Sequence, residues 1–102
     1  MSFYNILPQA EGDLDECAAY IAEDNLNVAL RLYDCADETN KALADNPKMG
    51  ERYPSQNPLL SDVRFFPILK FKNYLSSYRP TDSGIEIIRV LQTFRDIKNI
   101  LL

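Results

Sequence analysis

The hydrophobic pattern of this chain changes its period once, around residue 60. From residue 9 to residue 45, apolar side chains recur every three or four residues, which is typical of one face of a helix. From residue 63 to residue 92 they recur with a period near two, which is typical of strands. Because the two patterns are segregated, we expect an α+β fold of two layers, in which a helical hairpin packs on one face of a sheet.

The element boundaries follow from the residues that start or stop these patterns. Pro8 ends a first short strand and begins a helix, because proline is tolerated in the first helical turn. Asn25 can cap a second helix and Asn46-Pro47 stops it, and so short a link makes the two helices antiparallel. We predict strands at residues 3–7, 63–69, 73–79 and 85–92, helices at 9–24, 26–45 and 94–102, and an irregular loop at 51–61. The chain is then one domain, residues 1–102, with a mainly antiparallel sheet of about four strands and a short C-terminal helix.

Composition limits the classes of function. No stretch of about 20 apolar residues occurs and no basic start leads into an apolar run, so we expect a cytoplasmic protein with no membrane partner. The net charge of −4 combines −7 over residues 1–50 (three Lys/Arg, ten Asp/Glu) with +3 over residues 51–102 (eight Lys/Arg, five Asp/Glu). This asymmetry suggests two different partner surfaces, or simply two solvated faces. Direct specific binding of nucleic acid is not expected, because it calls for a more basic chain.

Missing residue types narrow the chemistry. The chain has no histidine, which removes the commonest general acid or base, and its three glycines supply no phosphate loop. Cys17 and Cys35 fall on the apolar stripes of the two helices, and we expect buried thiols rather than a disulfide or zinc ligands. We therefore expect no metal and no cofactor. Arginine and tyrosine side chains can still position and stabilise a phosphoryl group, but without a conventional base.

An arginine interrupts the apolar pattern of the last predicted strand. Arg89 is costly there unless a partner or solvent accommodates it, and both sides of this strand are largely apolar, so we expect a central strand covered on both faces. One interpretation is a face that binds an oxyanion or an acidic protein segment, because guanidinium groups bind oxyanions bidentately. The other is an internal salt bridge, for example with Glu86. Simple alternation puts Ile85, Ile87, Arg89 and Leu91 on one side of this strand. Neighbouring elements would add further residues to the binding face, namely Arg64, Tyr74, Tyr78, Arg79 and Arg95.

Two apolar side chains of the second predicted helix, Leu30 and Tyr33, point away from its core stripe. They are either incidental surface residues, which are common, or part of a docking patch.

Several segments, in order, resemble one known family. They are "LPQAEGDLDECAAYIAEDN" (residues 7–25), "ALADNPKMG" (42–50), "VRFFPI" (63–68), "NYLSSYR" (73–79) and "IEIIRVLQTFRDIKNIL" (85–101). With these segments the chain resembles the RelE/ParE superfamily of type II toxin–antitoxin toxins, and most closely its ParE branch, over nearly its whole length. The chain departs from the common pattern at Gln92, where many relatives carry a histidine before the Arg-Asp pair.

The resemblance implies a toxin, of a class associated with plasmid stabilisation, that is neutralised by a cognate ParD-like antitoxin and inhibits DNA gyrase by protein binding. The alternatives are a RelE-like ribosome-dependent mRNA endoribonuclease and a non-toxic relative that only binds a partner. We expect no catalytic residues for the first reading, and for the nuclease the candidates are Arg64, Lys72, Tyr74, Arg89 and Arg95. The expected target-binding residues are Arg64, Tyr74, Arg89, Gln92 and Arg95. The expected antitoxin-binding residues are Tyr20, Leu30, Tyr33, Arg64, Arg89 and Arg95.

Overall fold

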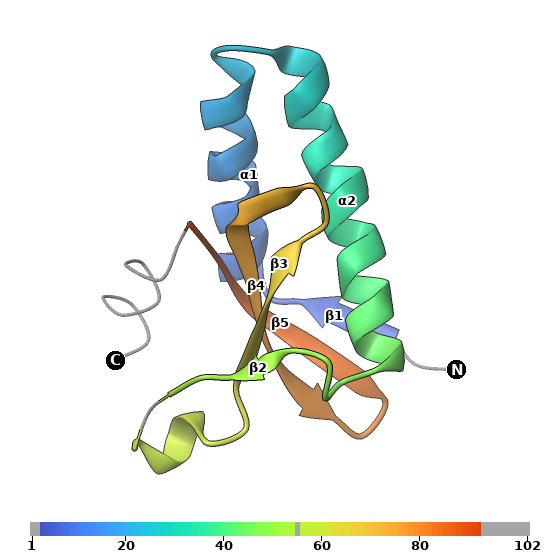
Figure 1. Cartoon of the computed structure of the whole chain (residues 1–102), viewed down its shortest axis with the longest axis vertical. Coiled ribbons are helices and arrows are strands. Elements are labelled where there is room, and N and C mark those ends of the chain that lie inside the picture. The colour runs from blue at the N-terminus through green and yellow to red at the C-terminus, as the bar shows by residue number, and fades with distance from the viewer. Residues whose placement is uncertain (1–2, 55, 93–102) are drawn as a thin grey trace.

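The order of helices and strands agrees with the expectation from the sequence. The computed structural model describes residues 3–54 and 56–92. The elements are β1 (Phe3–Ile6), α1 (Pro8–Ala22), α2 (Leu26–Asp45), β2 (Glu51–Arg52), the short 3₁₀ helix η1 (Pro58–Leu60), β3 (Arg64–Ile68), β4 (Phe71–Thr81) and β5 (Gly84–Gln92). Figure 1 shows α1 and α2 side by side as an antiparallel hairpin. The helix predicted at residues 94–102 lies outside the described residues.

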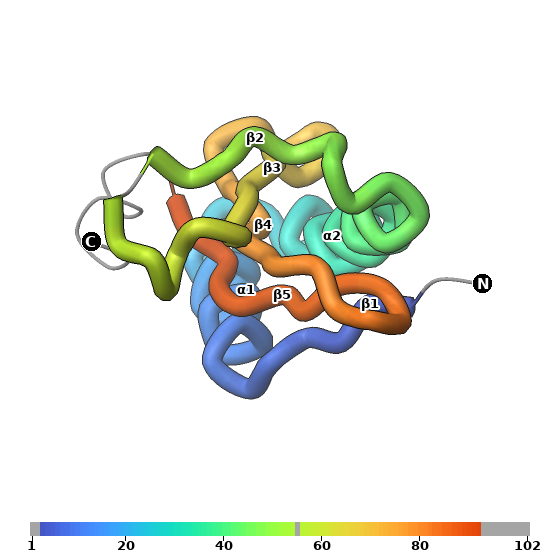
Figure 2. Tube along the Cα trace, turned by 90° about the horizontal axis from the view of Figure 1, so that it is seen from below, coloured from blue at the N-terminus to red at the C-terminus, as the bar shows by residue number. Residues whose placement is uncertain are grey.

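One mixed sheet carries the hairpin. Its strand order is β1-β5-β4-β3-β2, in which β1 runs parallel to β5 and all other neighbours are antiparallel. Figure 2 shows β1 and β2 at opposite sides of this sheet. The described sheet has five strands rather than about four, because two residues of the segment predicted as an irregular loop pair with the start of β3. The two-layer α+β class is confirmed.

The ends of the helices show why the hairpin forms where it does. Pro8 occupies the first turn of α1, where a missing N–H costs no hydrogen bond. The Asn25 side chain accepts a hydrogen bond from the backbone N–H of Val28 (3.2 Å), as the sequence predicted for the start of α2. Among the described residues, no helix is long and apolar enough to cross a membrane.

The sheet has a hydrophobic cluster on each face. Beneath the helices, side chains of α1 and α2 pack on β3, β4 and β5, with Leu32, Leu43 and Tyr78 completely buried. On the other face, the segment between α2 and β3 covers part of the sheet and buries Tyr53 and Val63. β5, which lies between β1 and β4, is therefore an interior strand with hydrophobic clusters on both faces, as expected.

A β-bulge in β5 corrects the predicted alternation. Ser77 and Tyr78 are neighbours in β4 but pair with residues of β5 two positions apart, so Ile88 has no partner in β4. An extra residue shifts the side chains beyond it to the opposite face. Val90 consequently joins the cluster beneath the helices, whereas Leu91 packs on the other face. Ile85, Ile87, Arg89 and Leu91 were predicted to share one face of this strand. That prediction is wrong beyond the bulge, because Leu91 lies on the face opposite Ile85 and Ile87.

The cysteines were predicted to be buried thiols, and this holds fully for one of them. Cys35 is buried in the cluster beneath the helices, and neither cysteine forms a disulfide. Cys17 is only half-buried, because it lines a small pocket between α1 and the ends of β4 and β5.

Tyr78 ties the loop after α2 to the sheet. Its hydroxyl donates to the carbonyl oxygen of Pro47 (2.7 Å) and accepts from the backbone N–H of Gly50 (2.9 Å), and the side chain has no exposed surface. A Cβ at Gly50 would collide with this hydroxyl and with the carbonyl oxygen of Phe65, so only glycine permits this approach. Burial is the main cause that raises the pKa of Tyr78, which therefore stays protonated and can donate.

We predict that Tyr78→Phe lowers the free energy of unfolding by about 1–3 kcal/mol, because a buried N–H and a carbonyl both lose their partner. Urea denaturation measures this. Tyr33→Phe is the matched control, since that hydroxyl lies at the surface and its loss costs less than about 0.5 kcal/mol. Equal losses in the two variants would contradict the role assigned to the Tyr78 hydroxyl.

Candidate functional site

The arginine that interrupts the last strand binds a carboxylate of α1. Arg89 donates from Nε to Oδ2 of Asp13 (2.6 Å) and from a terminal nitrogen to Oδ1 (3.0 Å). Oδ2 also accepts the backbone N–H of Val90 (3.1 Å). Both charged side chains are largely buried, with 17% and 14% of their surface exposed. The internal salt bridge considered for Arg89 exists, but its partner is Asp13 rather than Glu86.

The position of Asp13 follows from the end of β1. The last backbone hydrogen bond between the β1 segment and β5 runs from the N–H of Leu7 to the carbonyl oxygen of Ile87 (3.0 Å). Beyond it, β5 has no neighbouring strand on that side, while α1 turns back over the sheet. The carboxylate of Asp13 supplies the acceptor that a longer β1 would have supplied to Val90.

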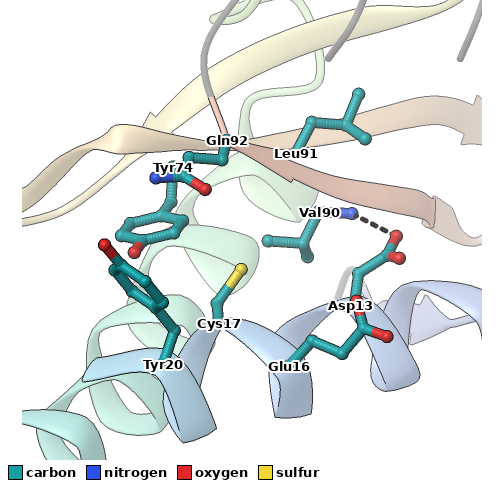
Figure 3. Close-up of a pocket in the computed structure, with 8 residues that line it drawn as sticks. All are labelled: Asp13, Glu16, Cys17, Tyr20, Tyr74, Val90, Leu91 and Gln92. Atoms are coloured by element: carbon teal, nitrogen blue, oxygen red, sulfur yellow. Dashed lines mark hydrogen bonds between the residues drawn. The ribbon is translucent and has the colours of Figure 1, made fainter. Parts of the chain in front are cut away.

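A pocket opens beside this ion pair, between α1 and the ends of β4 and β5. Figure 3 shows the side chains that line it, with the rings of Tyr20 and Tyr74 next to each other. Its volume is about 210 Å³, and the lining residues are Asp13, Glu16, Cys17, Tyr20, Tyr74, Val90, Leu91 and Gln92. Tyr74 is 8% exposed and forms the inner wall, whereas Tyr20 is 64% exposed and forms the rim. Three predicted site residues thus meet here, namely Tyr20, Tyr74 and Gln92.

The electrostatics of the pocket follow from burial and from the ion pair. Burial raises the pKa of Tyr74 above its ordinary value, and the neighbouring Cys17 and Tyr20 add to this. The hydrogen bonds to Asp13 raise the pKa of Arg89 further above its already high value, with a smaller contribution from Glu16. Tyr74 therefore stays protonated and Arg89 stays charged near neutral pH. In the described part of the chain, no group of three His, Cys, Asp or Glu side chains could hold a metal ion.

The other predicted cationic residues do not gather at this pocket. Arg64 donates to two carbonyl oxygens of the loop after α2, at 2.7 and 3.4 Å. It pairs with Tyr78, which lies four residues and about 13 Å along β4 from Tyr74. Arg79, which was placed on the binding face, instead donates to the carbonyl oxygen of Leu59 in η1 (2.9 Å) and forms a salt bridge with Asp62 (3.4 Å). Lys72 is exposed, and Arg95 lies outside the described residues.

The outer face of the hairpin carries an apolar stripe. Leu26, Leu30 and Tyr33 lie one helical turn apart on α2, and 63%, 56% and 37% of their respective surfaces are exposed. The hydroxyl of Tyr33 donates to Asp15 of α1 (2.7 Å), which places the stripe beside α1. Tyr20 follows Asp15 by five residues and therefore lies about 140° around the helix from it. The structure thus separates Tyr20 from Leu30 and Tyr33, with which it was grouped.

Sequence reasoning missed both acidic residues of the pocket, Asp13 and Glu16. Both lie on the acidic side of α1, where carboxylates are usually solvated. Glu16, Cys17 and Tyr20 lie three, four and seven positions along the helix from Asp13, which is the spacing of one shared face. The bulge that brings Val90 and Arg89 to Asp13 has no signal in the sequence, since no glycine marks it.

Comparison with known proteins assigns the chain to a class. The chain combines a two-helix hairpin on a mixed sheet with a pocket that offers aromatic and acidic side chains. Residues 4–97 match the family described as the ParE toxin of the type II toxin–antitoxin system parDE, and the chain therefore belongs to the ParE toxin family. This confirms the resemblance seen in the sequence. No curated protein gives a significant match.

A solved structure shares the fold. It is described as a chromosomal ParDE toxin–antitoxin system from P. aeruginosa, at 22% sequence identity and a TM-score of 0.70. The match covers 91% of this chain and 97% of the other.

We predict that Asp13→Ala lowers the free energy of unfolding by about 2–4 kcal/mol, because it leaves a largely buried guanidinium and a strand N–H without an acceptor. Asp15→Ala is the matched control on the same helix, where the carboxylate is exposed and its loss costs less than about 1 kcal/mol. Chemical denaturation of both variants gives the comparison. A similar, small loss in both would refute a structural role for the ion pair.

Proposed function

We propose that this chain is a toxin that acts in the cytoplasm by binding DNA gyrase, and that a ParD-like antitoxin neutralises it. The observation that carries this proposal is the match to the ParE toxin family over residues 4–97. The neighbouring solved structure is a ParDE system, which supports a partner of the ParD kind.

The surface supports action by protein binding. Large apolar side chains are exposed on the hairpin, where burying each against a partner is worth roughly 1.5–3 kcal/mol. Aromatic side chains on a surface are typical of the residues that dominate protein–protein binding energy. We propose the stripe of Leu26, Leu30 and Tyr33 for antitoxin binding, and Tyr74 and Gln92 at the pocket for target binding.

The nuclease alternative receives less support from the geometry. Its candidate residues would have to converge on one phosphate, but Arg89 is neutralised by Asp13 and Arg64 is bound to the loop after α2. The chain also contains no histidine to serve as a base.

We predict that the purified chain inhibits DNA supercoiling by gyrase, and that its expression without antitoxin arrests growth with a DNA-damage response. Supercoiling and cleavage-complex assays on plasmid DNA measure the first effect. Unchanged gyrase activity together with codon-spaced cuts in translating mRNA would favour the endoribonuclease. The absence of growth arrest would favour a non-toxic relative that only binds a partner.

We predict that Leu30→Asp weakens the complex with the antitoxin by about 10- to 100-fold, since an apolar contact is lost and a charge must be desolvated. The isolated variant should stay folded, because the side chain is more than half exposed. Leu59→Asp is the matched control, at a leucine that is 77% exposed in η1 and belongs to neither helix. Isothermal calorimetry with the co-purified antitoxin measures the affinity of each variant. Normal binding by Leu30→Asp would show that the stripe is not part of the antitoxin interface.

A further inference from the structure

We propose that the pocket between Glu16, Tyr20 and Tyr74 receives one basic side chain, an arginine or a lysine, from the antitoxin. The identity of the partner rests on the proposed function. The preference of the pocket for a basic side chain does not depend on the proposed function, because it follows from the lining residues alone.

One carboxylate at the pocket, that of Glu16, is not neutralised by a described basic side chain. The two oxygens of Asp13 are engaged by Arg89 and by the backbone N–H of Val90. Glu16 has no hydrogen bond or ion pair with any residue in the described ranges 3–54 and 56–92, and it acts on Arg89 only through its field. Asp13, Glu16 and Arg89 together therefore carry a charge of −1, which one added cation neutralises.

The aromatic walls suit the same ligand. Figure 3 shows the rings of Tyr20 and Tyr74 side by side at one end of the pocket, and the side chain of Glu16 beside Asp13 at the other end. A guanidinium or ammonium group placed against a tyrosine ring gains about 0.5–2 kcal/mol, and more as water is excluded. A guanidinium can also bind a carboxylate bidentately while it stacks on a ring. The volume of about 210 Å³ is that of one long side chain rather than of a helix or a strand.

Other occupants fit less well. An anion would meet the carboxylates of Asp13 and Glu16, and an apolar side chain would bury Glu16 without a partner. A second copy of this chain would bring the same acidic hairpin to the contact. The segment from residue 8 to residue 45 holds ten Asp and Glu against two basic residues, Arg31 and Lys41, so it attracts basic segments of a partner.

The first experiment uses the isolated chain and a small probe. N-acetyl-arginine methylamide should shift the amide NMR signals of Val90 and Leu91 saturably, with a dissociation constant in the millimolar range. N-acetyl-citrulline methylamide has nearly the same shape without the charge and should give no saturable shift. Glu16→Gln and Tyr20→Leu should each weaken binding of the arginine probe about fivefold. Glu11→Gln removes the same charge from α1 away from the pocket and should leave binding unchanged.

Three results would overturn the site. They are equal binding of the citrulline compound, no effect of Glu16→Gln, or a fall in Tm of more than about 5 °C in Glu16→Gln, which would show that the carboxylate already pairs within the chain. The second experiment repeats the titration on the complex with the co-purified antitoxin. Loss of the probe's shifts supports the antitoxin as the occupant, and undiminished binding overturns that assignment. Because neither titration involves gyrase, a negative supercoiling assay would refute the proposed target without touching this site.

Discussion

The carboxylate of Asp13 pairs with the part of β5 that extends beyond β1. Asp13 accepts two hydrogen bonds from Arg89 and one from the backbone of Val90, at 2.6, 3.0 and 3.1 Å. These bonds lie where β1 has ended and β5 would otherwise show an open edge to α1. The bulge at Ile88 occurs at the same level and turns Val90 under the helices. The angle at which α1 crosses the sheet thus depends on a charge pair as well as on apolar packing.

The four described arginines of the basic half of the sequence all donate hydrogen bonds within the chain. Arg89 is neutralised by Asp13, while Arg64 and Arg79 donate to carbonyl oxygens of two different loops. These guanidinium groups stabilise long loops that lack enough regular secondary structure to satisfy their own carbonyls. The described side chains that form the stripe and line the pocket are mostly aromatic, aliphatic and acidic, and most of them lie on the hairpin.

Local signals predicted the fold well and the site only in part. Pro8, Asn25 and Asn46-Pro47 are strong start and stop signals, so the helix ends agree with the structure within about two residues. The bulge depends on where β1 ends and on what α1 places beside β5, which is tertiary information. Alternation could therefore not assign Arg89 or Leu91 to a face. Tyr74 was found as part of the predicted arginine and tyrosine face, and Gln92 as a departure from the family pattern. Asp13 and Glu16 were not found, because they are two of ten acidic residues in the first half of the chain.

The geometry of the hairpin constrains any partner that uses both of its surfaces. The stripe of Leu26, Leu30 and Tyr33 lies beside Asp15, whereas the pocket lies on the flank of α1 that carries Cys17 and Tyr20. Positions 15 and 20 are about 140° apart around the helix axis, and a helix is about 10 Å thick. One straight helix cannot reach both flanks at once. A single chain that covers both must bend around α1, with an apolar segment on the stripe and a basic residue in a second segment at the pocket. Such a partner gains affinity from linking two modest contacts, because the second one forms within the first complex.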